Sequence, residues 1–220
     1  MNRTALVAGA SGLVGGHVTR LLLADPRCDR VTVLVRRDLP LTHKKLVQRV
    51  VDFDHLAHVT DFPRVHDVFC CLGTTIRQAG SEAEFRKVDY TYVMELARVA
   101  LRHRAAQFLV VTAVGADPRS RVFYSRVKGE VEDALRRLQF EGLHIFRPSL
   151  LLGSRAQTRP AEKVAIVLSP LVAWMLMGPL ARYRPIRAAT VARAMVRAAH
   201  PAQPGVHIYE GNGIRRLGAA

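Results

Sequence analysis

Residues 5–16 read Ala5-Leu6-Val7-Ala8-Gly9-Ala10-Ser11-Gly12-Leu13-Val14-Gly15-Gly16. Four apolar residues lead directly into glycines spaced three apart, and apolar residues recur at helical spacing from Val18 onward. This pattern predicts a buried strand, a tight glycine turn and the start of a helix. Glycine lets the backbone turn sharply and approach a ligand closely, and a helix start offers unpaired N–H groups to a pyrophosphate.

The glycine spacing is a variant of the dinucleotide-binding pattern Gly-x-Gly-x-x-Gly. A glycine turn can also join a strand to a helix for structural reasons alone. Because this turn lies between a strand and a helix at the start of the chain, we predict that it binds the phosphates of a dinucleotide. The residues expected to do so are Gly9, Ser11, Gly12, Leu13, Val14 and Gly15.

The rest of the chain alternates short apolar or β-branched runs with amphipathic segments. It has 220 residues, 49% of them hydrophobic, which is enough for one domain with one core. The alternation predicts a doubly wound parallel α/β sheet with helices on both faces. We assign residues 1–220 to a single domain, with a core at 1–152 and a small extension on the substrate side at 153–220. Further strands are expected at residues 31–35, 47–53, 65–72, 108–111, 143–146 and 206–209.

Two helices have recognisable polar caps. Ser81 precedes Glu84 by three residues, which is the spacing of a capping box, and apolar residues follow at helical spacing from Phe85 to Val99. Thr190 is expected to cap the last helix.

The second expected strand ends in Arg36-Arg37. Arg36 lies 21 positions after Gly15, near the place where an acidic residue holds the ribose hydroxyl of NAD. An arginine there accommodates the 2′-phosphate of NADP instead. The sequence therefore favours NADP(H), although two solvated arginines at a strand end are the simpler alternative.

A tyrosine and a lysine follow the strand expected at 108–111. Tyr124 and Lys128 are four positions apart, so they share one face of a helix. A tyrosine hydroxyl ordinarily loses its proton near pH 10, and a neighbouring ammonium group favours the ionised form. Such a pair can exchange a proton with a carbonyl or an alcohol. The spacing alone is common by chance, and only its place in a dinucleotide-binding sheet favours the chemical interpretation.

These residues together resemble the short-chain dehydrogenase/reductase superfamily, whose members have a Rossmann fold. The resemblance is stronger to its atypical branch, the NAD(P)H-binding oxidoreductases related to the animal Tat-interacting protein. It spans nearly the whole chain and is specific in the middle third. The matching residues are Val51–Phe53, Cys70–Thr75, Val88-Asp89, Gly115–Asp117, Val127–Glu132 and Phe146–Pro148.

The resemblance implies an NADPH-dependent oxidoreductase of the carbonyl reductase type, acting on a small carbonyl or quinone-like substrate. Tyr124 would be the general acid and base, and Lys128 its helper at the nicotinamide ribose. The family pattern would place Asp52 and Phe53 beside the adenine, Leu72, Gly73 and Thr74 near the ribose, and Pro148, Leu150 and Leu151 beside the nicotinamide.

Two residues depart from the superfamily pattern. Where many members carry a serine that steadies the reacting carbonyl, this chain has Thr112-Ala113. A hydroxyl from Thr112 could replace that serine, whereas Ala113 in the same place would leave one hydrogen bond missing. Asp89 stands where many relatives carry an asparagine that supports the lysine through water.

The departures leave room for a second class of function. A protein that binds NADPH as a sensor, regulator or assembly factor, with little or no catalysis, is the main alternative. Chemistry on sugar nucleotides, as in epimerase relatives, is a third. We expect it less because the C-terminal part is short for a nucleotide sugar.

Composition limits the partners and the compartment. The formal net charge is +15, but no basic run is longer than two, which does not favour a nucleic-acid role. The three cysteines suit buried thiols rather than disulfides or a zinc site, and the histidines show no metal spacing. A core strand stands where a signal peptide would be. We therefore predict a cytoplasmic protein without a metal.

Residues 164–181 are nearly all apolar and are interrupted by Pro170 and Pro179. We expect buried or lid helices over the substrate pocket. Because basic residues flank the run, the alternative is a peripheral contact with a membrane or a protein. The sequence leaves the choice between a monomer and a homodimer open.

Overall fold

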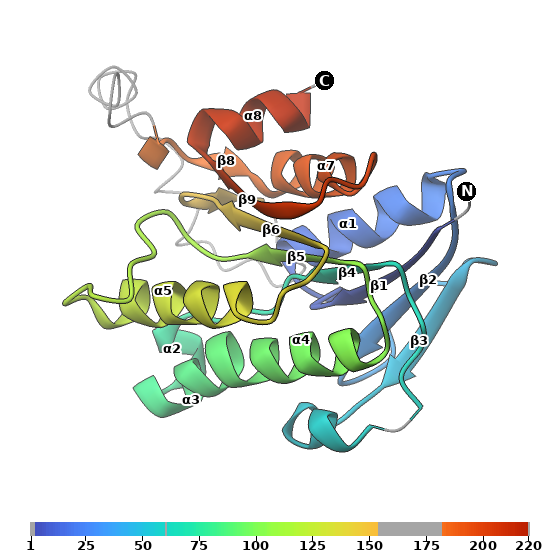
Figure 1. The fold of residues 1–220 in the computed structure, drawn as a ribbon, viewed down its shortest axis with the longest axis horizontal. Helices are drawn as coiled ribbons and strands as arrows, with labels where there is room; N and C mark the ends of the chain where they lie inside the picture. The colour runs from blue at the N-terminus through green and yellow to red at the C-terminus, as the bar shows by residue number, and fades with distance from the viewer. Residues whose placement is uncertain (1–2, 60, 154–181, 220) are drawn as a thin grey trace.

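The computed structural model describes residues 3–59, 61–153 and 182–219. Seven strands form one sheet in the order β3-β2-β1-β4-β5-β6-β9, and all neighbouring pairs are parallel (Figure 1). The chain moves outward from β1 first to one side and then to the other, which confirms the doubly wound parallel sheet. The strands are β1 (Arg3–Ala8), β2 (Cys28–Val35), β3 (Leu46–Val50), β4 (Asp67–Cys70), β5 (Gln107–Val111), β6 (Gly142–Arg147) and β9 (Gly205–Glu210).

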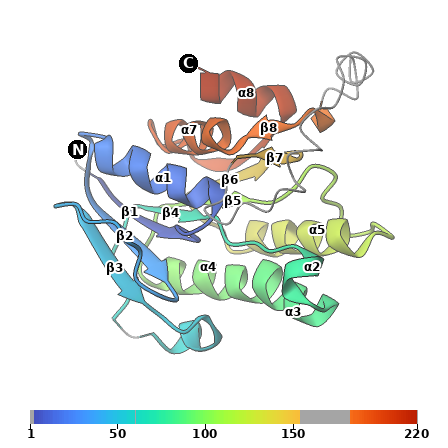
Figure 2. The ribbon, with the colours of Figure 1, turned by 180° about the vertical axis from the view of Figure 1, so that it is seen from behind.

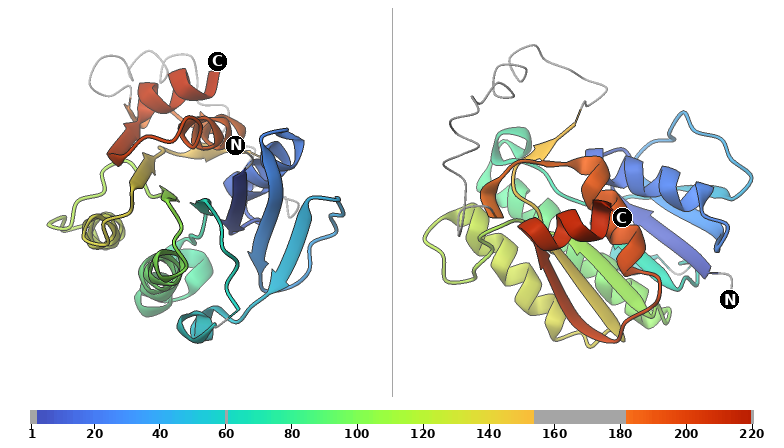
Figure 3. Two further views of the ribbon diagram at one scale, coloured as in Figure 1. Left: turned by 45° about the vertical axis from the view of Figure 1, so that its right-hand side comes forward. Right: turned by 90° about the horizontal axis from the view of Figure 1, so that it is seen from above.

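Helices cover both faces of the sheet, as predicted (Figure 3, left). One face carries α1 (Leu13–Ala24), α7 (Ala188–Ala198) and α8 (Gly211–Ala219). The other face carries α4 (Tyr92–Arg102) and α5 (Phe123–Arg136). The shorter elements of that second side are η1 (Phe53–His58), α2 (Ile76–Ala79), α3 (Glu82–Arg86) and the π-turn η2 (Lys87–Thr91).

The strand β1 shows why the core strands are almost continuously apolar. Val7 packs into the cluster under α1 and α7, whereas Leu6 packs into the cluster under α4. Successive side chains of a strand point to opposite faces, so a sheet that is covered twice needs apolar residues at every position.

Two predicted boundaries were wrong, and one predicted cap was correct. The strand expected at 47–53 ends at Val50, because Asp52 accepts the Asp54 N–H at 2.9 Å and caps η1. The last predicted helix begins at Ala188, so Thr190 lies inside α7 and does not cap it. The Ser81 cap was correct: its hydroxyl accepts the Glu84 N–H at 3.1 Å.

The helix α8 was not predicted. Its sequence is rich in glycine, which lowers helix propensity, and packing stabilises it instead. A Cβ on Gly218 would lie 2.3 Å from the Thr190 carbonyl oxygen, so the glycine allows α8 to approach α7 closely.

The C-terminal part belongs largely to the main sheet. The sequence assigns residues 153–220 to a substrate-side extension, but β9 completes the main sheet, and α7 and α8 cover the face that α1 also covers. Two short strands, β7 (Leu151–Leu152) and β8 (Ile186–Arg187), form a separate two-stranded parallel sheet (Figure 2). Residues 164–181, and with them the predicted lid or contact surface, lie outside the described residues.

A chain of buried polar groups crosses the sheet under α7. The ring of His144 lies 3.2 Å from the Tyr209 hydroxyl and 3.2 Å from the Gln107 amide oxygen. The Gln107 amide donates to Asp67 at 2.6 Å, and Asp67 also pairs with Arg3. Burial lowers the pKa of His144 to about 4, with a smaller contribution from His207. The imidazole is therefore neutral near pH 7.

This histidine predicts a specific acid sensitivity. The unfolded chain binds the His144 proton below about pH 6.5, but the folded protein binds it only below about pH 4. The contribution of the neutral His144 ring to the free energy of unfolding is therefore fully present above pH 6.5. It is lost as the pH drops toward 4, which lowers the free energy of unfolding by about 3 kcal/mol. Urea unfolding between pH 7 and 4 should show a shallower loss in His144→Gln than in the wild type. The control His58→Gln, at an exposed position, should show the wild-type dependence of the free energy of unfolding on pH. The same dependence in His144→Gln would show that His144 is not the source of the acid sensitivity.

Candidate active site

The glycine turn is built against the end of β4. Gly9 has a φ of +85°, a conformation that glycine adopts at little cost. A Cβ there would lie 2.4 Å from the Cys71 carbonyl oxygen. A Cβ on Gly15 would lie 2.1 Å from the Gly9 carbonyl oxygen, because α1 packs onto the turn. Both positions therefore require glycine, and the Gly12 N–H closes the turn by donating to Gly9 at 2.9 Å.

The start of α1 is open to an anion. No side chain caps it, and its first turn contains no acidic residue. Ser11 and Gly12 are exposed and Leu13 is half-buried, while Val14 and Gly15 are buried beneath them. The N–H groups and positive dipole end of this helix therefore face a surface that fits the phosphates of a dinucleotide.

Arg36 and Arg37 follow β2, which lies beside β1. Because the strands are parallel, both arginines are at the same edge of the sheet as the glycine turn. Both are exposed, and neither makes a hydrogen bond or an ion pair with any residue that the structure describes. Their positive charge is thus available at this edge.

A buried ion pair lies next to the end of β4. Lys128 Nζ is 2.7 Å from Asp89 Oδ1, and both side chains are almost fully buried. The other Asp89 oxygen accepts the Thr74 N–H at 2.8 Å. A Cβ on Gly73 would lie 3.4 Å from Asp89 Oδ1 and 3.8 Å from Lys128 Nζ. The ion pair therefore ties α5 and η2 to the Leu72–Thr74 loop.

The π-turn η2 carries Asp89 in its interior. It joins α3 to α4, so the predicted single helix contains a wide turn at residues 87–91. Such turns are rare and often occur at functional sites. Here the turn lies in the segment that brings a buried carboxylate to Lys128.

Burial acts to lower the pKa of Lys128, but the negative charge of Asp89 and the proximity of Tyr124 outweigh it. The pKa therefore lies above its ordinary value of 10.5. Lys128 is a permanent ammonium group near neutral pH, and its charge acts on Tyr124.

Tyr124 lies in the first turn of α5 and is half-buried. Its ring packs against Phe85, with 5.4 Å between ring centroids. Among the described residues, no group makes a hydrogen bond with its hydroxyl. The Tyr124 hydroxyl is therefore available to a ligand, while Phe85 of α3 holds the ring in place.

The Thr112 hydroxyl is engaged inside the protein. It donates to Glu132 Oε1 at 2.6 Å, below α5. Glu132 also accepts from Arg147, with Nε at 2.9 Å and Nη2 at 2.5 Å, and Arg147 reaches Glu210 at 2.7 Å. These contacts direct the Thr112 hydroxyl into the protein, and the Ala113 side chain has no hydroxyl to offer. The geometry therefore gives no support to the predicted role of Thr112 toward a carbonyl.

Sequence reasoning gave no role to Glu132 and Arg147. Glu132 is four positions after Lys128 and eight after Tyr124, so it lies on the same inward face of α5. A carboxylate on that inward face, beside the apolar Val131 and Leu135, was the feature of the sequence that could have indicated a buried ion pair.

The remaining predicted residues lie at the ends of β3, β4 and β6. Asp52 is exposed, and its carboxylate pairs with the His55 ring, with 2.7 Å between Oδ2 and Nδ1. Phe53 is buried. Pro148 is buried and accepts the Val114 N–H at 3.0 Å, whereas Leu150 is 58% exposed and Leu151 begins β7. The structure thus brings the glycine turn, Leu72–Thr74, Asp89, Lys128 and Tyr124 into one contiguous edge, with the arginines and Asp52 further out.

The two cysteines at the end of β4, Cys70 and Cys71, are not reactive groups. Burial raises the pKa of the Cys70 thiol to about 12 and raises that of Cys71 as well. Both are free, as is Cys28. Among the described residues, no three His, Cys, Asp or Glu side chains are placed to hold a metal ion.

The fold is a Rossmann sheet, and the residues at this edge resemble those of the atypical short-chain dehydrogenases/reductases. More particularly, the chain belongs to the HIM1 family, whose model matches residues 40–175. It is 38% identical to the protein HTATIP2 of Rattus norvegicus over 168 aligned residues, covering 74% of this chain and 69% of that protein. It is 30% identical to the protein FMP52 of Coccidioides immitis over 238 aligned positions, covering 98% of this chain and 96% of that protein. The resemblance inferred from the motifs is confirmed.

Solved structures agree on the fold. An oxidoreductase of the short-chain dehydrogenase/reductase family from Burkholderia thailandensis superposes with a TM-score of 0.68 at 21% identity, over 96% of this chain and 92% of that one. The human epimerase family protein SDR39U1, solved with NADPH, gives 0.62 at 18% identity, over 93% and 73%. These similarities show a shared Rossmann sheet.

The predicted cytoplasmic location is contradicted by the relatives, because the FMP52 proteins of several fungi are named mitochondrial. The prediction rested on reduced cysteines, and free thiols indicate a reducing compartment without saying which one. Within the described part of the chain, no helix is both long enough and apolar enough to cross a membrane.

Proposed function

We propose that the protein is an NADPH-dependent reductase of small carbonyl or quinone-like compounds. The observation that carries the proposal is the arrangement of Tyr124, Lys128 and Asp89 at the same sheet edge as an uncapped glycine turn. The family relationship supports a nicotinamide dinucleotide, and SDR39U1 was solved with NADPH. NADPH, when bound, supplies the hydride.

The cofactor's phosphates are expected at the start of α1, where the unpaired N–H groups and the helix dipole favour an anion. Arg36 and Arg37 would hold the 2′-phosphate, because guanidinium groups bind phosphate oxygens well. Asp52 and Phe53 would border the adenine, Leu72 to Thr74 the ribose, and Pro148, Leu150 and Leu151 the nicotinamide.

Tyr124 gives its proton to the substrate oxygen in this proposal. Lys128 stabilises the phenolate that remains, because its ammonium charge lies one helical turn away. Asp89 holds that ammonium group in place from the π-turn. Because Thr112 is bonded to Glu132, Tyr124 is the hydrogen-bond donor that we assign to the substrate oxygen.

A panel of aldehydes, ketones and quinones tests this activity. The purified chain is expected to oxidise NADPH with at least one of them, followed by the loss of absorbance of the reduced cofactor. If NADPH binds but no compound is reduced, the second function is favoured.

That second function is an NADPH-binding sensor or assembly factor. It is favoured by one observation, the engaged Thr112 hydroxyl, which leaves fewer donors for a developing oxyanion. A partner recovered only with NADPH present, together with no turnover on the panel, would support it.

Arg36→Ala separates the two cofactors. The variant loses a guanidinium group that would contact the 2′-phosphate, which only NADPH carries. A hydrogen bond to a charged group contributes about 1.5–3 kcal/mol, so we expect roughly tenfold or greater weakening for NADPH and little change for NADH. Fluorescence titration of both cofactors measures this, with Arg104→Ala, another exposed arginine, as the control. Equal losses for NADPH and NADH would refute the 2′-phosphate assignment.

A further inference from the structure

A cavity lies at the amino ends of the strands, whereas the glycine turn lies at their carboxyl ends. It has a volume of about 480 Å³, within the usual range for small-molecule sites. Arg27 directly precedes β2, and His200 and Gln203 lie in the connection between α7 and β9. The glycine turn instead follows β1. Because the strands are parallel, the cavity and the proposed cofactor site are at opposite ends of the strands.

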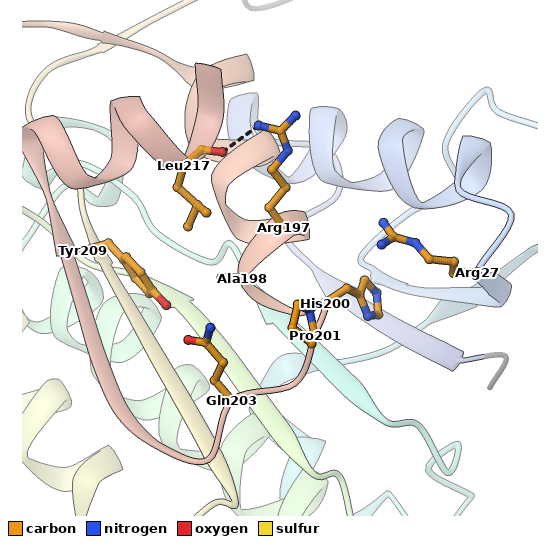
Figure 4. Close-up of a pocket in the computed structure, with 8 residues that line it drawn as sticks. All are labelled: Arg27, Arg197, Ala198, His200, Pro201, Gln203, Tyr209 and Leu217. Carbon is orange, nitrogen blue, oxygen red and sulfur yellow. Dashed lines mark hydrogen bonds between the residues drawn. The ribbon is translucent and has the colours of Figure 1, made fainter. Parts of the chain in front are cut away.

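The polar lining of this cavity is basic. Arg27, Arg197 and His200 contribute nitrogen groups, and none of the described residues brings a carboxylate to the lining. Asp25 offsets the charge of Arg27 with contacts of 2.9 and 2.7 Å. Arg197 donates one N–H to the Leu217 carbonyl at 2.9 Å and has no carboxylate partner among the described residues (Figure 4). Its other donors remain available.

His200 adds a neutral polar group beside these arginines. Burial lowers its pKa below the usual 6.5, so its ring is uncharged near pH 7. The ring makes no hydrogen bond with any described residue and can donate or accept one.

The remaining lining is mixed. Leu217, Ala198 and Pro201 provide apolar surface beside the half-buried ring of Tyr209. The Tyr209 hydroxyl and the Gln203 amide point toward each other (Figure 4). The Tyr209 hydroxyl also lies 3.2 Å from the buried His144 ring, which fixes its position. An apolar wall next to an uncompensated arginine suits an amphipathic anion.

We propose that this cavity binds a small organic anion, with a carboxylate or phosphate head at Arg197 and His200 and an apolar body against Tyr209 and Leu217. Guanidinium groups recognise both heads through paired N–H donors. The site is separate from the dinucleotide site and does not depend on its chemistry.

The full chain, titrated calorimetrically with benzoate and with phenyl phosphate, tests the proposal. Benzamide, a neutral molecule of the same shape as benzoate, is the matched ligand control. Binding of at least one anion in preference to benzamide is expected, and the better of the two identifies the head group. Equal binding of benzamide, or no binding of either anion at millimolar concentration, would overturn the proposal.

Two arginines of α7 provide a matched pair of variants. Arg193 donates to the Gly218 carbonyl at 2.7 Å just as Arg197 donates to Leu217, but only Arg197 lines the cavity. Arg197→Gln should weaken the anion about tenfold, and Arg193→Gln should leave it unchanged at a comparable cost in stability. His200→Gln, which breaks no hydrogen bond among the described residues, should also weaken it. Similar affinities in Arg193→Gln and Arg197→Gln would place the anion elsewhere.

Discussion

Tyr124→Phe is expected to lower kcat by about 10²–10⁴-fold for whichever compound the wild type reduces fastest. This is the usual contribution of a positioned general acid. Phenylalanine keeps the ring that packs on Phe85 and removes only the hydroxyl that would protonate the substrate oxygen. The dissociation constant for NADPH should stay within about twofold, because in this proposal the cofactor is held mainly by the glycine turn, the arginines and Lys128. Single-turnover kinetics and fluorescence titration measure the two quantities separately.

The matched control is Tyr90→Phe. Like Tyr124, Tyr90 is half-buried and its hydroxyl makes no hydrogen bond among the described residues, but its ring packs under Arg86 and it is not placed at Lys128 in this proposal. This variant should retain the wild-type kcat. Wild-type turnover in Tyr124→Phe would remove Tyr124 from the reaction, and a loss of NADPH binding would show that its hydroxyl serves the cofactor instead.

Glu132→Ala is expected to lower the free energy of unfolding by about 3–5 kcal/mol, the usual cost of removing one partner of a buried ion pair. Glu132 is fully buried and joins Thr112, Arg136 and Arg147. Without it, the Arg147 guanidinium, whose side chain is only 19% exposed, keeps a single carboxylate contact at Glu210. Urea unfolding measures the loss.

Glu130→Ala on the same helix is the control. Its carboxylate pairs with Arg86 at the surface, where the contribution of an ion pair is about 0–1 kcal/mol. The double variant Glu132→Ala/Arg147→Ala should lose less stability than the sum of the losses in the two single variants. It removes both charges together, so that neither remains buried without the other. A loss in Glu132→Ala no larger than in Glu130→Ala would show that the buried cluster does not stabilise the fold.

The sheet and its glycine turn could be predicted because their signals are local. Apolar runs of a few residues mark β1, β2, β5 and β6, and glycine spacing marks the turn after β1. The spacing of Tyr124 and Lys128 places both on one face of α5 without reference to the rest of the chain. The α8 helix had no such signal, because its stability comes from packing on α7 rather than from its glycine-rich sequence.

The sequence by itself thus determined the class of fold and the edge of the sheet at which a ligand is expected. It also determined that Tyr124 and Lys128 share one face of a helix. Only the tertiary structure decided what the polar side chains at that edge contact. It paired Asp89 with Lys128 through a π-turn, and it directed the Thr112 hydroxyl to Glu132. These contacts join elements far apart in the chain. Their geometry depends on how helices pack on the sheet, which residue spacing within one element does not specify.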